Sequence, residues 1–460
     1  MSFNVKRQLL GAAGAGGGPA YFFSVIEPGT DGGSGNCAHV RVDSSDNIFV
    51  DFDYYDNPNY NLGLVKYDTG GNVLAQNEIS GVQRRPATPA DLGGFNWASA
   101  IDGSGNFKVV SNSGSDKIAF LTINPSTLAT SSSYEKKFSS GSTYSGFMDT
   151  SGNGYLLGRD GSGGTMNIAK FNSSGSQQFS KGYAFYTPFG ANWAFPYGGG
   201  VDSSGNVYIG GSHPFFGYEG IITKLNSSGT HQWTRNRYVS GRNNAYQRIG
   251  FDSSGNAYAV GYISENTGGS EISYIAKFNS SGTFQWDYVL EYDNQKGCFQ
   301  DIAFDSSGNI YLAGSFQEDP IGNFAGSYRW FGVFAKLNSS GTLQWQRGLG
   351  YTSAVQNDND MFSSIAIDSN DDMVLCSVQD NTSASGDPCR VYVARLPNDG
   401  SLTGSYNQVD AKYESTNFSD QSIGDTRNAT LNSSNNQSIS SSTFGGSDNS
   451  VTYTINTETA

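Results

Sequence analysis

Short runs rich in β-branched and aromatic residues recur along the chain, and each is bounded by a cluster of Asp, Asn, Ser and Gly. Residues 300–304 (QDIAF) and 310–316 (IYLAGSF) form one such pair, joined by residues 305–309 (DSSGN). Runs of this length and composition are typical of β-strands, and the residues between them are those that close tight turns. The pair therefore predicts an antiparallel hairpin.

A second hairpin is expected directly after the first. Residues 333–338 (VFAKLN) and 342–348 (TLQWQRG) flank a turn at 338–341 (NSSG). In both turns, Asp or Asn opens a type I turn through its side chain, and Gly takes the left-handed position that completes a bulged hairpin. The two hairpins together predict a unit of four strands.

The four-strand unit occurs seven times. Aligned on the aspartate that opens the first turn, the copies have spacings of 59, 47, 53, 50, 53 and 63 residues. A repeat of about fifty residues that contains four short strands has the size of a propeller blade. Because one blade alone leaves apolar surface open to water, we predict an all-β fold, a closed seven-bladed β-propeller. The aligned turn residues are Asp43, Asp102, Asp149, Asp202, Asp252, Asp305 and Asp368.

Two of the seven turns lack the usual glycine. The first and seventh copies have Asp46 and Asp371 at that position. Aspartate enters the left-handed region more readily than most residues, so we expect both turns to form, with some backbone strain at the aspartate.

The seventh unit lacks a convincing fourth strand after the turn at 397–400 (PNDG). The N-terminal segment 20–29 (AYFFSVIEPG) is rich in aromatic residues and directly precedes the first hairpin, as the fourth strand of every other unit precedes the next unit. We therefore predict that residues 20–27 complete blade seven and close the ring.

Three regions follow from this assignment. Residues 1–19 form an N-terminal glycine-rich docking arm, residues 20–402 the propeller, and residues 403–460 a Ser/Thr/Asn-rich β-containing tail. In the tail, residues 408–415 (QVDAKYES) and 450–459 (SVTYTINTET) favour an added hairpin or small sheet, and an irregular tail is the alternative. Lys6, Arg7 and a short apolar patch resemble a secretory signal weakly, but glycine breaks the patch at once, which favours a retained arm.

The charge and hydrophobicity of the chain limit the kinds of partner that it is expected to bind. The chain has 460 residues, a formal net charge of -14 and 15% charged residues. Nucleic-acid binders need clustered Lys and Arg, so we expect no nucleic acid among the partners. No apolar run is long enough to span a membrane as a helix.

Residues that commonly carry chemistry do not cluster along the sequence. His39, His213 and His231 are far apart and no GxSxG motif occurs, which favours structural histidines over a nucleophile–base pair. The cysteines follow no metal or redox spacing, and the DSSGN turns lack the closing Glu of a calcium loop. We expect no enzyme, no metal and no cofactor. A disulfide between Cys376 and Cys389 is the alternative to four ordinary thiols.

The loops are more informative than the turns. Loops between strands two and three and between blades share the face opposite to the turns, and they are long, varied and aromatic. Aromatic side chains near Asn, Asp and Gln suit sugar stacking or a protein partner, although packing onto the disc is the alternative for each of them. The candidates are Tyr54, Tyr55, Tyr60, Tyr186, Phe189, Trp193, Phe215, Phe216, Tyr218, Phe324, Tyr328 and Trp330. By contrast, Trp233, Trp286 and Trp345 recur at one place in the fourth strand and are expected to pack blades.

The repeated phrase, DSSGNxY followed by AKLNSSGxxQW, resembles the secreted bacterial β-propeller repeat (SBBP) and, less closely, the NHL repeat. The resemblance covers about residues 20 to 400 and implies a propeller fold without fixing an activity. The ends, VKRQLLGAAGAGG and VTYTINTETA, resemble segments of structural proteins from virions of marine bacteriophages.

These resemblances imply a non-enzymatic virion protein displayed on a tail, fibre or capsid. Its expected partners are other virion proteins, reached through the N-terminal arm and C-terminal tail, and a host-surface glycan or protein at the aromatic loops. The alternative is a secreted or surface bacterial propeller that binds carbohydrate or protein, located outside the cell or on its surface. A propeller hydrolase or lyase is a third reading.

Overall fold

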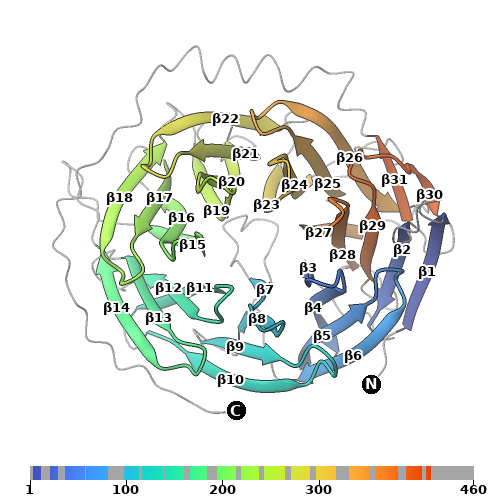
Figure 1. Ribbon diagram of the computed structural model, residues 1–460, viewed down its shortest axis with the longest axis horizontal. Helices are drawn as coiled ribbons and strands as arrows, with labels where there is room; N and C mark the ends of the chain where they lie inside the picture. Colours follow the sequence, from blue (N-terminus) through green and yellow to red (C-terminus); the bar gives the residue numbers. More distant parts are fainter. Residues whose placement is uncertain are drawn as a thin grey trace.

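The chain folds into a ring of seven β-sheets in the computed structural model (Figure 1). The structure describes residues 4–11, 21–28, 37–56, 59–80, 98–112, 117–138, 141–159, 166–183, 194–213, 219–237, 243–264, 271–290, 297–316, 331–351, 358–381, 390–406 and 411–415. The sheets are antiparallel throughout, so the prediction of a seven-bladed propeller with four-stranded blades is confirmed.

Blades one to six each consist of four consecutive strands, with the first strand innermost. Blades one and two contain β3 (Ala38–Val42), β4 (Ile48–Asp56), β5 (Asn59–Tyr67), β6 (Val73–Ser80), β7 (Ser99–Ile101), β8 (Phe107–Asn112), β9 (Ile118–Ile123) and β10 (Thr130–Lys136). Blades three and four contain β11 (Ser142–Met148), β12 (Gly154–Arg159), β13 (Met166–Phe171), β14 (Gln177–Tyr183), β15 (Phe195–Val201), β16 (Val207–His213), β17 (Glu219–Leu225) and β18 (His231–Arg237). Blades five and six contain β19 (Asn244–Phe251), β20 (Ala257–Ser264), β21 (Glu271–Phe278), β22 (Phe284–Leu290), β23 (Gly297–Phe304), β24 (Ile310–Phe316), β25 (Phe331–Leu337) and β26 (Leu343–Tyr351).

The N-terminal strand closes the ring. Blade seven contains β27 (Asp358–Ile367), β28 (Met373–Asn381) and β29 (Arg390–Leu396), and its fourth strand is β2 (Tyr21–Glu27), antiparallel to β29. This confirms the predicted closure. β1 (Asn4–Gly11), in the segment expected to be a docking arm, pairs with β2 and forms a fifth strand of the same blade.

The start of the C-terminal tail also joins a blade. β31 (Ala411–Ser415) pairs with β26 of blade six, and β30 (Gly404–Tyr406) pairs with β31, so the predicted β-structure after the propeller is present here as a hairpin. The second predicted tail strand, within 450–459, lies outside the described residues. β1 and β30 are thus the outer edge strands of neighbouring blades (Figure 1).

The core lies between the blades. The buried apolar side chains of the described residues gather in seven clusters, one at each blade interface. Alternation along β28 shows why: Val374, Cys376 and Val378 face blade one, whereas Met373 and Leu375 face blade six. Both faces of a blade are therefore buried, which is the reason that the ring has to close.

The turns have the predicted geometry. Asp305 Oδ1 accepts backbone N–H bonds from Ser307 and Asn309, at 3.1 and 2.8 Å. Gly308, with φ of 77°, takes the left-handed position. Asp46 and Asp371 occupy the same region with φ of 59° and 63°, as expected from the sequence.

Candidate functional site

The predicted aromatic face is described only in part. Tyr54 is 3% exposed, its hydroxyl donates to Glu78, and its side chain packs in the apolar cluster between blades one and seven. Tyr55 and Tyr60 lie opposite each other in β4 and β5, where only their backbones are described. The remaining candidates lie outside the described residues: Tyr186, Phe189, Trp193, Phe215, Phe216, Tyr218, Phe324, Tyr328 and Trp330.

The turn aspartates have a second role that the sequence pattern did not reveal. In blade six, the Tyr311 hydroxyl donates to Asp305 at 3.2 Å, and Lys336 Nζ lies 3.6 Å from the same carboxylate. Lys336 also lies over the Tyr311 ring, 4.8 Å from its centroid. The lysine of the third strand thus links the turn to the blade interior, because it pairs with the turn aspartate and makes a cation–π contact with the tyrosine of the second strand. The same cation–π pair occurs in blades three, four and five as Lys170–Tyr155, Lys224–Tyr208 and Lys277–Tyr258.

Blades two and seven build the same ion pair from other residues. In blade two the lysine is on the second strand, where Lys108 Nζ lies 3.2 Å from Asp102 and 2.8 Å from Thr122 Oγ1. In blade seven Val374 takes the place of the tyrosine, and Arg395 takes that of the lysine. The smaller valine leaves room for the guanidinium, which is fully buried beside Asp368 and Asp372.

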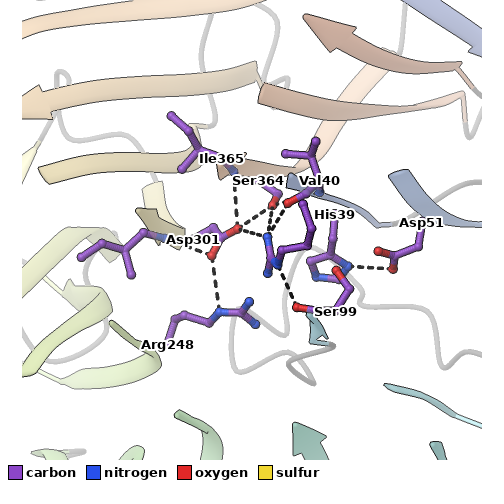
Figure 2. Close-up of polar contacts among 10 residues, drawn as sticks. His39, Val40, Asp51, Ser99, Arg248, Asp301, Ser364 and Ile365 are labelled. Carbon is purple, nitrogen blue, oxygen red and sulfur yellow. Dashed lines mark hydrogen bonds and ion pairs between the residues drawn. The ribbon is translucent and has the colours of Figure 1, made fainter. Parts of the chain in front are cut away.

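A polar cluster occupies the ring axis, where the innermost strands meet (Figure 2). Arg41 of β3 is its centre. Its Nε donates to the Ser99 carbonyl of blade two at 2.7 Å, and its Nη1 donates to Asp301 of blade six and Ser364 of blade seven, both at 3.2 Å. One side chain of blade one therefore contacts three other blades.

Asp301 joins the arginines to each other. Its Oδ1 lies 3.4 Å from Arg248 Nε, and its Oδ2 accepts the Ser364 hydroxyl. Burial opposes ionisation of this carboxyl, but Arg41 and Arg248 outweigh it and lower its pKa to about 2. Asp301 is consequently an anion throughout the neutral range, and it compensates one of the two guanidinium charges.

His39 and Asp51 lie beside this network. His39 Nδ1 is 3.2 Å from Asp51 Oδ2, and both side chains are almost completely buried. Burial lowers the pKa of His39, and the attraction of Asp51 only partly opposes the shift. A neutral imidazole held by a carboxylate is the result, in keeping with the structural role expected for this histidine.

Sequence reasoning missed the axial cluster, although a signal was present. His39, Arg248, Asp301 and Ser364 each stand four residues before the turn aspartate of their own blade. At this position of the inner strand the repeats disagree, and three of the four residues are ionisable. Aligning the repeats on this position would have placed the four side chains at one level of the ring.

Other predicted chemistry can be located in part. Cys376 is a buried free thiol, whereas Cys389 lies outside the described residues. Within the described ranges, no group of three or more His, Cys, Asp or Glu side chains could hold a metal ion. In the same ranges, no helix has the length and apolar character needed to cross a membrane.

Comparison with solved structures shows distant likeness. Polysaccharide lyase Uly1 is 10% identical, with 78% of this chain and 90% of that chain covered and a TM-score of 0.45. The β-propeller domain of the Trilobed protease from Pyrococcus furiosus is 9% identical, with 80% and 98% covered and a TM-score of 0.43. A protein of unknown function from Dyadobacter fermentans is 10% identical, with 81% and 99% covered and a TM-score of 0.44.

No protein-family model matches the chain, and no curated protein matches it. Likeness at this level carries no conclusion about activity or ligand. The strand order of the chain itself establishes its architecture, a seven-bladed β-propeller that is closed by β2.

Proposed function

We propose that this chain is a non-enzymatic structural protein of a bacteriophage virion. It is displayed on a tail, fibre or capsid, where it contributes to assembly and binds a host-surface glycan or protein. The observation that carries the proposal is the position of the two terminal segments. β1 adds to the outer edge of blade seven, and the β30–β31 hairpin adds to the outer edge of the neighbouring blade six.

This arrangement suits attachment at one side of the disc. Both added strands lie in the same sector of the rim (Figure 1). Edge strands present unpaired backbone groups that can pair with another chain. An anchor at blades six and seven leaves the other five blades available for display.

Mass spectrometry of purified virions tests the assembly role. The chain is expected at a constant copy number per particle after density-gradient purification. A particle preparation without the chain would contradict the proposal. Lys412→Pro would then test the anchor, because proline removes a backbone donor from β31, and it is expected to reduce incorporation while the isolated protein still folds.

Glycan binding is tested separately with the isolated full chain. On a glycan array, Trp193→Ala and Phe216→Ala are expected to weaken binding, because aromatic rings stack on sugar faces. Ser307→Ala in an exposed turn serves as the matched control and should bind as the unaltered chain does. Equal binding by all four proteins would exclude the aromatic loops as the binding surface.

The second candidate is a secreted or surface bacterial propeller that binds carbohydrate or protein. The resemblance of the repeated segments to SBBP repeats favours it. It predicts a processed N-terminus, so a mature protein that still begins with Met1 or Ser2 would count against it. A propeller hydrolase or lyase predicts turnover, and glycans that bind without being cleaved would count against that third reading.

A further inference from the structure

The two aspartates that replace glycine in the turn between the first and second strands each bond to the same turn of the preceding blade. Asp371 of blade seven accepts the backbone N–H of Ser306 in blade six at 2.8 Å, and the hydroxyl of the same serine at 2.5 Å. Asp46 of blade one accepts the same two donors from Ser369 of blade seven, at 2.9 and 2.6 Å. The structure therefore builds one kind of inter-turn contact twice, with nearly the same distances.

These two contacts flank blade seven. Ser306–Asp371 joins blade six to blade seven, and Ser369–Asp46 joins blade seven to blade one. Blade seven contains β2 together with β27, β28 and β29, so its pairing of β2 with β29 is what closes the ring (Figure 1). No peptide linkage joins these two strands directly, which makes blade seven the place where the ring can open.

The other junctions between blades have no such contact. Glycine stands at the position of Asp46 and Asp371 in the remaining five blades, and it has no side chain to accept a bond from the preceding turn. Blades two and three are joined at this level by a backbone bond instead, from the Gly103 N–H to the Thr150 carbonyl at 2.8 Å. The carboxylate contact is therefore confined to the two junctions of blade seven.

The backbone at these aspartates is unfavourable for a residue with a side chain. Asp46 and Asp371 have φ of 59° and 63°, in the left-handed region that glycine enters without a steric cost. Backbone strain of this kind persists where the contacts around it compensate for it. Two hydrogen bonds from one serine to a carboxylate supply that compensation.

We propose that Asp46 and Asp371 fasten blade seven to its two neighbours and limit the opening of the ring at this blade. Loss of either inter-turn contact lets blade seven open more often, while the blades on the opposite side of the ring stay closed. The inference holds whether or not the chain is part of a virion.

Hydrogen exchange of the full chain, followed by mass spectrometry, tests the acceptors through Asp46→Gly and Asp371→Gly. Glycine removes the carboxylate and also relieves the left-handed strain, so aspartates that are merely tolerated predict unchanged or slower exchange. The proposal predicts the opposite: exchange of β28 and β29 should be about tenfold faster in each variant, the effect of losing about one net hydrogen bond. Exchange of β12 and β13 in blade three should stay within about twofold and serves as the internal reference.

Proline variants test the donors. Ser306 and Ser369 are the second residues of their turns, a position that favours proline in a type I turn, so Ser306→Pro and Ser369→Pro remove the N–H and the hydroxyl while keeping the turn. Each should again speed exchange of β28 and β29 about tenfold. Ser253→Pro in blade five is the matched control, because the following turn has Gly308 and no carboxylate, and exchange should stay within about twofold in every blade.

Three results would overturn the proposal. Unchanged or slower exchange of blade seven in both glycine variants would mean that the aspartates are only tolerated in their turns. An equal increase in blades three and seven would indicate lower global stability in place of local opening. Blade-seven exchange that rises no more in Ser369→Pro and Ser306→Pro than in Ser253→Pro would show that the serine donors do not hold the blade.

Discussion

Phe22 of β2 lies directly against Gly71 in the second turn of blade one. A Cβ atom on Gly71 would come within 2.6 Å of the Phe22 ring. The same contact recurs around the ring, where Trp286 covers Gly341 and Trp345 covers Gly400 of the next blade. β2 therefore supplies both the missing strand of blade seven and the aromatic side chain that joins it to blade one.

The first prediction concerns this closing contact. Phe22 is completely buried, so Phe22→Ala should lower the free energy of unfolding by about 3–5 kcal/mol. Trp345→Ala, at the equivalent position of blade six, should cost a similar amount, although no chain terminus lies there. Leu74→Ala is the control, because Leu74 is 54% exposed and its truncation should change little. Urea denaturation measures all three, and a Phe22→Ala protein as stable as Leu74→Ala would show that β2 does not close the ring.

The second prediction separates backbone strain from the close approach of Phe22. Gly71 and Gly105 both have positive φ, of 75° and 80°. No atom lies within 4 Å of a Cβ placed on Gly105. Gly105→Ala should therefore cost only the left-handed strain, about 1 kcal/mol, whereas Gly71→Ala adds a clash with a buried ring.

A double-mutant cycle provides the check on Gly71. In the Phe22→Ala background, Gly71→Ala should cost no more than Gly105→Ala, because the clashing ring has been removed. An additive result would mean that Phe22 and Gly71 are not coupled.

The fold could be predicted from the sequence because the turn residues and the strand patterns that specify a blade are local in the chain and repeat. In most turns the opening Asp or Asn and the left-handed Gly act within five residues and keep the same geometry from blade to blade, and Asp46 and Asp371 take the place of that Gly in blades one and seven. The closing strand was predictable for the same reason, since Phe22 stands opposite Arg395 as Trp345 stands opposite Lys336.

Only part of the axial cluster could be predicted in this way, because the repeat alignment puts four of its side chains at one level of the ring but does not show that Arg41 joins them. Arg41 and Asp301 are 260 residues apart, and their contact exists only once the ring has closed. The second role of the turn aspartates was missed for a related reason. Lys336 is far from Asp305 in sequence, and strand pairing brings it beside the turn, opposite Tyr311.

The third prediction compares two equivalent ion pairs. Arg395 in blade seven is 1% exposed and lies against Asp368 and Asp372. Its removal leaves two buried carboxylates without their cation, so Arg395→Met should cost about 3–5 kcal/mol. Lys336→Met removes the corresponding cation of blade six, which is 13% exposed and 3.6 Å from Asp305, and should cost about 1 kcal/mol. Urea denaturation at neutral pH measures the loss of unfolding free energy in each variant. Equal losses in Arg395→Met and Lys336→Met would contradict the difference expected from burial.

The fourth prediction concerns acid stability and Asp301. The folded pKa is about 2, whereas an unfolded aspartate titrates near 3.9. Because the folded pKa is the lower one, the ionised carboxylate stabilises the fold at pH values above the unfolded pKa. This contribution, about 2 kcal/mol, is lost as the pH falls through the folded pKa.

Asp301→Asn should therefore be less stable than the unaltered chain at pH 7, and the difference should shrink by about 1 kcal/mol at pH 3, because an unfolded aspartate is by then mostly protonated while the folded one is not. Asp46→Asn is the matched control: its carboxylate accepts bonds from Ser369 in an exposed turn, where solvent screens the charge. Urea denaturation at several pH values measures the two differences. A gap between Asp301→Asn and the unaltered chain that stays constant from pH 7 to pH 3 would mean that the arginines do not hold Asp301 ionised in the folded protein.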